Sequence, residues 1–211
     1  MSGEAKHKAV KESPKSTIER LESLHPYEML LYLAILASSL IFMFMIIAFS
    51  IRNLAGTQEV PYSLPKAFTF STIILLLSNF RIGQLVKNFE QENLSEITRS
   101  LQISLLMSLS FIITQVFGWY KLYEQNLTIS DDLSIAYLYV ISGLHLFHVV
   151  GGLIYLVYCN FKCLSASGDG VKELVFFTNK FERMKLKLLN TYWTFLDISW
   201  LIIFFWFFFL F

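Results

Sequence analysis

The stretch Ser142-Gly-Leu-His-Leu-Phe-His-Val-Val-Gly-Gly152 decides how this chain folds, because it places two histidines inside a long apolar segment. A strongly polar or ionisable side chain in the core of a membrane costs about 2.5 kcal/mol or more unless it faces other protein. His145 and His148 are three residues apart and therefore share one face of a helix. Gly143 and Gly152 bracket them, and we expect both glycines to let a neighbouring backbone come close. The stretch predicts a helix inside a bundle, with both rings turned towards other helices.

The composition is that of an integral membrane protein. Of the 211 residues, 55% are hydrophobic, 17% are aromatic and 16% are charged, and the mean hydropathy is +0.55. A soluble domain of this size is less apolar. The net charge is only +1, and the basic residues flank apolar segments rather than forming a cluster. Because phosphate binding needs clustered cations, nucleic acid is not an expected partner.

Five apolar segments are long enough to cross a membrane, since about 20 helical residues cover the ~30 Å hydrocarbon core. We therefore predict an all-α integral membrane protein, a bundle of five transmembrane helices. A polar tail at residues 1–26, with no sign of a signal peptide, precedes a single membrane domain at residues 27–211. The expected spans are residues 27–50, 67–86, 101–121, 134–160 and 192–211.

The distribution of lysine and arginine predicts the orientation of the bundle. Of the 17 basic residues, only Arg52, Lys66 and Lys121 fall in segments on the side opposite the N-terminus. Cytoplasmic segments carry the excess of basic residues in membrane proteins. We therefore expect a cytoplasmic N-terminus and a periplasmic C-terminus.

Polar residues within the spans should face other helices. The second span contains Ser71, Thr72, Ser78 and Asn79. Asp197 in the fifth span is the most costly residue to bury, and either a structural hydrogen bond or a proton relay would explain it. Our hypothesis is that Asp197 pairs with one of the two histidines, so that replacing it by asparagine should weaken the bundle.

The connector before the fifth span, residues 162–190, mixes basic and apolar residues at helical spacing. It predicts an amphipathic surface helix, either as a plain interfacial connector or as a specific lipid or partner site.

Cys159 and Cys163 lie four residues apart on one face. We expect two reduced thiols, because a zinc site needs four ligands and this end is predicted to lie on the reducing side.

The residues do not predict a metal or haem site in this chain. A haem held between helices needs a histidine from each of two faces, whereas His145 and His148 share one helix. A histidine pair also lacks the third ligand that a copper or zinc site requires. No catalytic motif is present within a span. We therefore assign no catalytic, cofactor-binding or metal-binding residue.

The fourth and fifth spans resemble subunit III of the haem-copper oxidases, the cytochrome c and quinol oxidases of respiratory chains. The family pattern G-x-H-G-x-H-V-x-x-G is matched by Gly143, His145, His148, Val149 and Gly152, with Leu146 at the inner glycine. The pattern Y-W-H-F-x-D-x-x-W is matched by Tyr192, Trp193, Phe195, Asp197 and Trp200, with Thr194 at the histidine. The five expected spans are similar in number to those of the short bacterial form of the family.

This resemblance implies a non-catalytic accessory subunit of a respiratory oxidase in the bacterial inner membrane. It would pack directly on subunit I, beside subunit II and other respiratory subunits, and the haem and copper would belong to those partner chains. It would hold phospholipid and support sustained oxygen reduction and proton pumping by the complex. The residues expected in interhelical or lipid-cleft contacts are Gly143, His145, His148, Gly152, Trp193, Asp197 and Trp200.

Two departures from the family concern carboxylates. Leu36 stands where many members carry an acidic residue in the first span, and Gly118 stands where a glutamate often follows the glutamine of the third. The resemblance therefore does not extend a proton-collecting role to these positions.

The alternatives to a cytochrome c oxidase subunit are subunit III of a quinol oxidase, a small transporter bundle and a haem-binding anchor. Sparse interior polar groups disfavour the transporter, and the histidine count disfavours the anchor.

Overall fold

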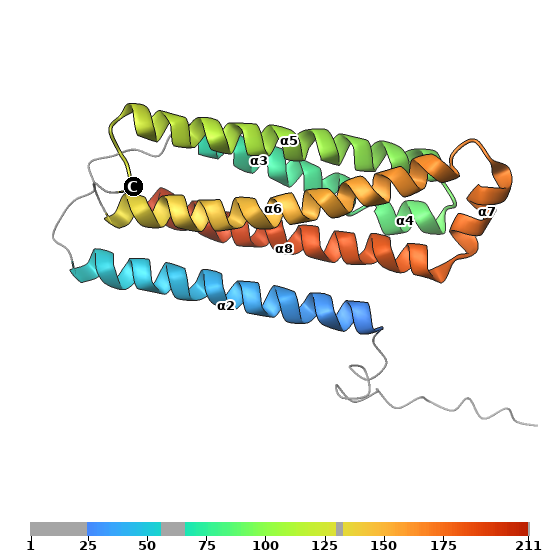
Figure 1. The fold of residues 1–211 in the computed structure, drawn as a ribbon, viewed down its shortest axis with the longest axis horizontal. Coiled ribbons are helices and arrows are strands. Elements are labelled where there is room, and N and C mark those ends of the chain that lie inside the picture. Colours follow the sequence, from blue (N-terminus) through green and yellow to red (C-terminus); the bar gives the residue numbers. More distant parts are fainter. Residues whose placement is uncertain (1–24, 56–65, 130–132, 211) are drawn as a thin grey trace, which may run out of the picture.

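The computed structural model describes residues 25–55, 66–129 and 133–210, and every regular element within these ranges is a helix (Figure 1). The helices are α2 (Pro26–Ala55), α3 (Lys66–Ile82), α4 (Leu85–Glu90), α5 (Leu94–Glu124), α6 (Leu133–Ala166), α7 (Gly170–Thr178) and α8 (Lys180–Leu210). Within the described residues, five segments are long and apolar enough to cross a membrane: Pro26–Ile51, Lys66–Glu90, Leu94–Glu124, Leu133–Ala166 and Lys180–Phe209. The predicted all-α bundle of five spans is confirmed. The tail before residue 25 lies outside the described ranges, and the orientation of the termini stays a prediction.

Four helices form the core and the fifth lies beside it. Helices α3, α5, α6 and α8 form a closed ring in which α3 and α6 each contact both α5 and α8. Helix α2 lies outside this ring and contacts α6 and α8 (Figure 1). Only 6% of the most apolar part of α2 is buried, against 33% to 44% in the other spans. The four-helix ring therefore forms most of the core, to which α2 adds Phe42 and Phe49.

The α3–α5 contact is lined by small polar residues. Ser100, Ser104 and Ser108 recur every four residues along α5, and all three are buried. The Ser104 hydroxyl donates a hydrogen bond to the backbone carbonyl of Ser78 on α3, at 3.4 Å. Small residues let membrane helices approach closely where large side chains would hold them apart.

Turns at the α7 end of the bundle set the helix limits. Glu92 has a positive φ of 52°, and the Asn93 side chain accepts from the backbone N–H of Glu96, so that α5 begins at Leu94. An asparagine cap of this kind satisfies one of the exposed N–H groups at a helix start. The third span, expected to begin at residue 101, therefore begins at Leu94.

The basic connector before the fifth span, residues 162–190, is divided among three helices, and its first residues still belong to α6. Only Gly170–Thr178 forms a separate short helix, capped by Asp169, which accepts from the N–H groups of Val171 and Lys172. Asn179 then has an extended backbone, and its side chain accepts from the N–H of Phe181 at 2.9 Å. From Lys180 onwards the sequence contains no glycine or proline, so the rest of the connector continues directly into α8.

Helix α2 is attached to the core at its two ends and at its centre. At the α7 end, Glu28 forms an ion pair with Lys187, with 2.8 Å between the carboxylate oxygen and Nζ. At the other end, the ring of Phe49 lies 5.5 Å from those of Tyr137 and Phe207. At the centre, the Ser38 hydroxyl lies 3.0 Å from Nε2 of His148 on α6. Most of the other described side chains of α2 are apolar, and these gain little by leaving lipid for protein.

Replacing Ser38 by alanine should loosen α2 at its centre. Interhelical hydrogen bonds in membranes contribute about 0.6 kcal/mol on average, so we expect a small loss of stability. We also expect a broader distance distribution between spin labels at Leu36 on α2 and Ile202 on α8, measured in a background without the two native cysteines. Ser39→Ala is the matched control, because the Ser39 hydroxyl donates to Ile35 within α2. Equal distributions for the two variants would show that Ser38 does not hold α2.

Candidate functional site

His145 lies at the centre of the bundle and makes its contacts through its ring faces and edges. It is fully buried, and its ring centroid lies 5.0 Å from that of Trp200 on α8 and 6.0 Å from that of Phe111 on α5. Phe42 of α2 lies 6.2 Å away. Neither ring nitrogen has a hydrogen-bond partner among the described residues. His145 therefore joins helices by aromatic packing.

His148 makes polar contacts to three helices. Its Nδ1 lies 2.8 Å from the carbonyl of Leu144, and since a carbonyl can only accept, Nδ1 carries the proton. In the neutral ring Nε2 is then the acceptor for the Ser38 hydroxyl of α2. The backbone carbonyl of His148 accepts from the Tyr192 hydroxyl of α8 at 3.1 Å. One residue of α6 thus contacts both α2 and α8 through hydrogen bonds.

A layer of hydrogen bonds joins α3 to α5 and α8. Gln115 of α5 donates to the Ser71 hydroxyl at 2.8 Å, and Trp200 of α8 donates to the Thr72 hydroxyl at 2.9 Å. Both hydroxyls in turn donate to the carbonyl of Phe68 within α3. The prediction that polar residues of the second span face other helices is confirmed for Ser71 and Thr72.

Of the two glycines expected to let a neighbouring backbone come close, only Gly152 makes a tight contact, and it does so with side chains of α8. A Cβ atom at Gly152 would lie 3.0 Å from Tyr192 and 3.2 Å from both Trp193 and Leu196 of α8. At Gly143 the nearest atoms, in the Trp119 ring, would be 3.9 Å away, which is an ordinary contact. The expectation for Gly143 is therefore wrong, because the nearest neighbour there is the Trp119 side chain of α5 at an ordinary contact distance.

A second close approach, at Gly118, was not predicted. A Cβ atom at Gly118 would lie 2.8 Å from the ring of Phe68 on α3. The space that a glutamate would need at this position is therefore filled by an aromatic ring. The departure from the family pattern at Gly118 is accompanied by tight packing between α3 and α5.

The predicted pairing of Asp197 with a histidine is wrong. Asp197 is buried, yet neither carboxylate oxygen has a hydrogen-bond partner within residues 25–55, 66–129 and 133–210. The ring nitrogens of His148 are already engaged by Ser38 and Leu144, and Trp200 is the α8 residue that faces His145. The indole N–H of Trp193, one helical turn before Asp197, also has no partner in this part of the chain.

A partly enclosed ion pair lies at the α7 end of α8. Glu182 and Lys185 are 2.9 Å apart, and their side chains are only 11% and 12% exposed. Lys185 also donates to the Tyr158 hydroxyl at 3.2 Å, and its Nζ lies 4.7 Å from the centre of the Phe181 ring. Such a well-partnered pair is costly to break from one side only.

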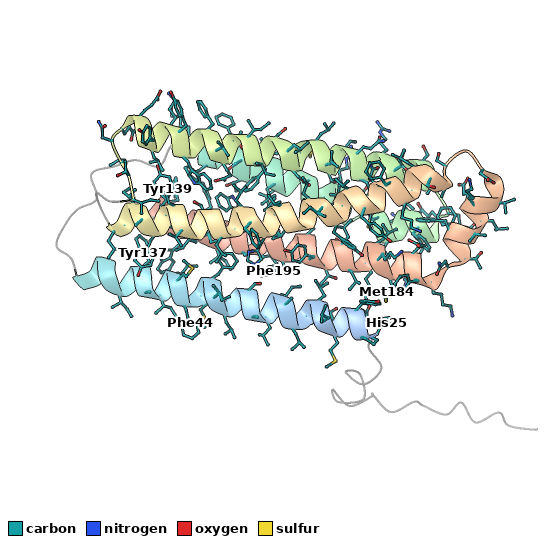
Figure 2. All side chains as sticks on the ribbon, viewed as in Figure 1. His25, Phe44, Tyr137, Tyr139, Met184 and Phe195 are labelled. Atoms are coloured by element: carbon teal, nitrogen blue, oxygen red, sulfur yellow. The ribbon has the colours of Figure 1, made fainter. Side chains whose placement is uncertain are left out.

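Two apolar cavities separate α2 from the core. The first, of about 600 Å³, lies between Tyr27–Ala34 of α2 and the α7-end halves of α6 and α8. The second, of about 390 Å³, lies between Ser39–Ile47 of α2 and Phe195–Trp206 of α8. Figure 2 shows Met184 and Phe195 on the side of α8 that faces α2, and Phe44 on the far side of α2. The contact at Ser38 falls between the two cavities along α2. We call the two cavities together the α2 cleft.

The described residues offer no assembled metal site. No three side chains of histidine, cysteine, aspartate or glutamate within the described ranges lie close enough to hold a metal ion. Cys159 and Cys163 are buried and both are free thiols, as expected.

Sequence analysis missed three residues that complete these contacts: Ser38, Phe42 and Gln115. A serine or glutamine inside an apolar span is itself a signal of a helix contact, because lipid offers it no partner. That signal identifies Ser38 and Gln115 as contact residues but not their partners. Phe42 carries no such signal, since phenylalanine is equally suited to lipid and to a core.

Long apolar helices around an interior of paired hydroxyls, amides and aromatic rings define a multi-pass α-helical membrane protein whose polar residues hold helices together. A family model described as cytochrome c oxidase subunit III matches residues 24–210. The chain therefore belongs to the cytochrome c oxidase subunit III family.

Individual relatives agree with this family. The chain is 28% identical to the cytochrome bo(3) ubiquinol oxidase subunit 3 of Buchnera aphidicola subsp. Schizaphis graminum, over 63% of this chain and 65% of the relative. It is 28% identical to the probable cytochrome c oxidase subunit 3 of Rickettsia prowazekii, over 68% of this chain and 47% of the relative. A probable cytochrome c oxidase subunit 3 of Mycobacterium leprae is 27% identical over 63% and 61%. The chain thus spans about half to two thirds of the length of these relatives.

Replacing Gly152 by alanine should destabilise the bundle. The added methyl group meets three side chains of α8 at 3.0 to 3.2 Å, and overpacking of this kind costs about 1–3 kcal/mol. Thermal unfolding in detergent measures the effect. The control is Gly143→Ala, for which ordinary contacts and better helix propensity predict an unchanged or slightly raised melting temperature. Equal losses in the two variants would contradict the close contact at Gly152.

Replacing Asp197 by asparagine should leave the melting temperature unchanged or raise it. The amide keeps the shape of the side chain, and it is less costly to bury than a carboxylate that lacks a partner. Glu182→Gln is the comparison, because it breaks an enclosed ion pair and should cost about 3 kcal/mol. A loss in Asp197→Asn as large as in Glu182→Gln would show that Asp197 has a strong partner.

Proposed function

We propose that this chain is the non-catalytic subunit III of a respiratory haem-copper terminal oxidase. The observation that carries the proposal is the family match over residues 24–210, which includes the motifs of the fourth and fifth spans. The contacts of the two histidines support it. His145 is enclosed by aromatic rings, and both ring nitrogens of His148 are engaged within the chain. These rings serve helix packing, so electron transfer and oxygen reduction belong to haem- and copper-bearing partner subunits.

The proposed complex is a cytochrome c oxidase, in which this chain packs on subunit I beside subunit II and other respiratory subunits. Several relatives are named as subunits of that enzyme. A quinol oxidase is the second candidate, because the Buchnera relative is named as a subunit of a ubiquinol oxidase. Bacterial relatives and the basic residues on one side favour the bacterial inner membrane, with a cytoplasmic N-terminus.

The α2 cleft is the proposed binding site for structural phospholipid. Its cavities, of about 600 and 390 Å³, are lined mainly by apolar side chains, which suit acyl chains. The hydroxyl groups of Tyr155 and Tyr158 and the ammonium group of Lys185 line the cavity near α7, where they suit a polar headgroup. Bound lipid would fill the space beside α2 and stabilise the oxidase during turnover, supporting sustained oxygen reduction and proton pumping.

A tag on the N-terminus of this chain should recover an oxidase from native membranes extracted with mild detergent. We expect larger haem-bearing subunits in the purified material and a reduced-minus-oxidised spectrum with an a-type or o-type haem band. The position of the band identifies the haem type of the partner subunit. Oxidation of added cytochrome c or of added quinol identifies the electron donor. A colourless chain, recovered alone even after crosslinking in the membrane, would contradict the proposal.

The control is the oxidase purified through a tag on its haem-bearing subunit from cells that lack this chain. An accessory role predicts intact haem bands and a comparable initial rate of oxygen consumption, followed by faster loss of activity. Loss of the initial rate with intact haem bands would show that this chain takes part in the chemistry itself.

A further inference from the structure

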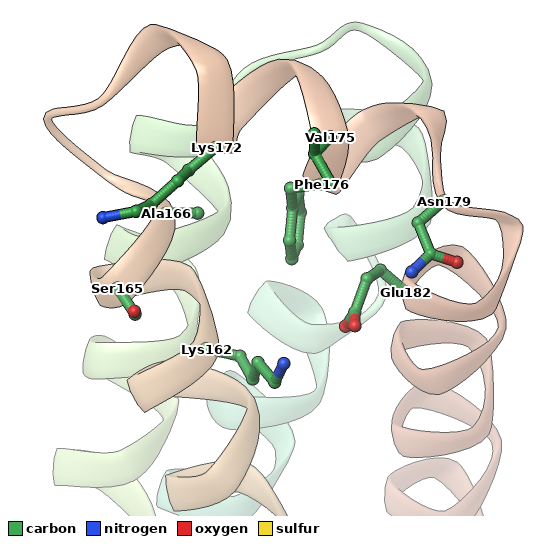
Figure 3. A pocket seen from close by; sticks show the side chains of 8 residues that line it. All are labelled: Lys162, Ser165, Ala166, Lys172, Val175, Phe176, Asn179 and Glu182. Carbon is green, nitrogen blue, oxygen red and sulfur yellow. The ribbon is translucent and has the colours of Figure 1, made fainter.

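A pocket outside the α2 cleft lies where α6 ends, α7 crosses and α8 begins. Its volume is about 200 Å³, and all three helices contribute to its walls (Figure 3). One side is apolar and is formed by Ala166, Val175 and Phe176. The other side is polar and is formed by five side chains, those of Lys162, Ser165, Lys172, Asn179 and Glu182.

Two of the polar residues belong to α6. Lys162 points into the space between α6 and α8 (Figure 3), and it forms no ion pair with any residue that the structure describes. Ser165 lies one turn further along α6, also lines the pocket, and is exposed to solvent. An ammonium group and a hydroxyl group are therefore presented from the same helix face.

Lys172 of α7 and Asn179, which lies between α7 and α8, add two further polar side chains. Lys172 lies 3.4 Å from Asp169, but both side chains are well exposed, at 63% and 44%, and such a pair contributes little. The oxygen of the Asn179 side chain accepts from the N–H of Phe181, so its amide NH₂ group remains as a donor at the pocket.

Glu182 is the one carboxylate among the described residues that line this pocket, and its charge is already compensated. Its carboxylate is paired with Lys185 at 2.9 Å, with both side chains nearly enclosed. The pocket therefore offers hydrogen-bond donors from several directions and an excess of positive charge, from Lys162 inside it and from Lys172 at its outer edge (Figure 3).

We propose that this pocket binds a phosphate group, carried either by an anionic phospholipid headgroup or by a free organic phosphate. A tetrahedral oxyanion accepts from donors that converge from different directions, and charge-assisted bonds to ammonium groups strengthen the contact. The apolar wall at Val175 and Phe176 suits the carbon atoms of a glycerol unit. The charge distribution predicts that this end faces the cytoplasm, where anionic lipids attract basic segments next to spans. The inference does not depend on the oxidase assignment.

The test uses the purified full chain in mild detergent, with phosphatidylglycerol titrated in native mass spectrometry and glycerol 3-phosphate titrated in calorimetry. The double variant Lys162→Gln/Lys172→Gln should bind the phosphate-bearing probe about 30-fold more weakly, as expected for the loss of two lysine contacts. Ser165→Asp, which adds a negative charge one turn from Lys162, should weaken binding as well. Lys180→Gln is the matched control, because Lys180 is an exposed lysine at the same end that does not line the pocket.

The two probes distinguish the source of the phosphate. Weaker binding of phosphatidylglycerol alone would identify a lipid headgroup site, and weaker binding of both probes would identify a site that also takes free organic phosphates. Phosphatidylglycerol held in the α2 cleft is a constant background in all variants. If the double variant and Lys180→Gln bind both probes as tightly as the unmodified chain, the proposal is wrong.

Discussion

The hydrogen bonds from Gln115 and Trp200 to the hydroxyls of Ser71 and Thr72 fix the arrangement of the core. Lipid offers no hydrogen-bond partner, so polar side chains inside a membrane are satisfied only by their own or another helix. Here each hydroxyl does both, because it donates within α3 and accepts from α5 or α8. The position of Trp200 is set in this way, and His145 packs against its ring. The histidine layer therefore depends on α3, although α3 contributes no histidine.

Helix α2 shows what happens where such bonds are few. Within the membrane-spanning part, Ser38 provides its hydrogen bond to the core, and aromatic contacts at Phe42 and Phe49 provide the rest. Apolar side chains are nearly as well solvated by lipid as by protein, so little free energy draws the remainder of α2 inwards. The cleft beside α2 is a direct consequence of this weak attraction. A bound acyl chain would replace protein contacts at small cost.

The sequence predicted the spans and the residues that face other helices better than it predicted their partners. Helical period and apolar length indicated the five helices, and the cost of burying polar groups indicated that Ser71, Thr72 and His145 lie inside. Partners depend on the rotation and depth of each neighbouring helix, which a single sequence does not specify. Asp197 and His145 lie at comparable depths in their spans, and this led to the predicted pairing. In the structure, however, Trp200 is the α8 residue that faces His145. The close approach at Gly152 depends in the same way on side chains of α8, and Gly143 has no comparable neighbour.

The Glu182–Lys185 ion pair relates the two proposed binding sites to each other. Glu182 lines the pocket at α7, and Lys185 lines the cavity of the α2 cleft near α7. The pair therefore forms part of the wall between an apolar site for acyl chains and a polar site for phosphate. While it is intact, Lys185 is neutralised, and the excess positive charge at the α7 pocket comes from Lys162 and Lys172. Loss of the Glu182 carboxylate would leave Lys185 as an unpaired cation on the cleft side of this wall. The Glu182 carboxylate thus sets the net charge of the wall that the two proposed sites share.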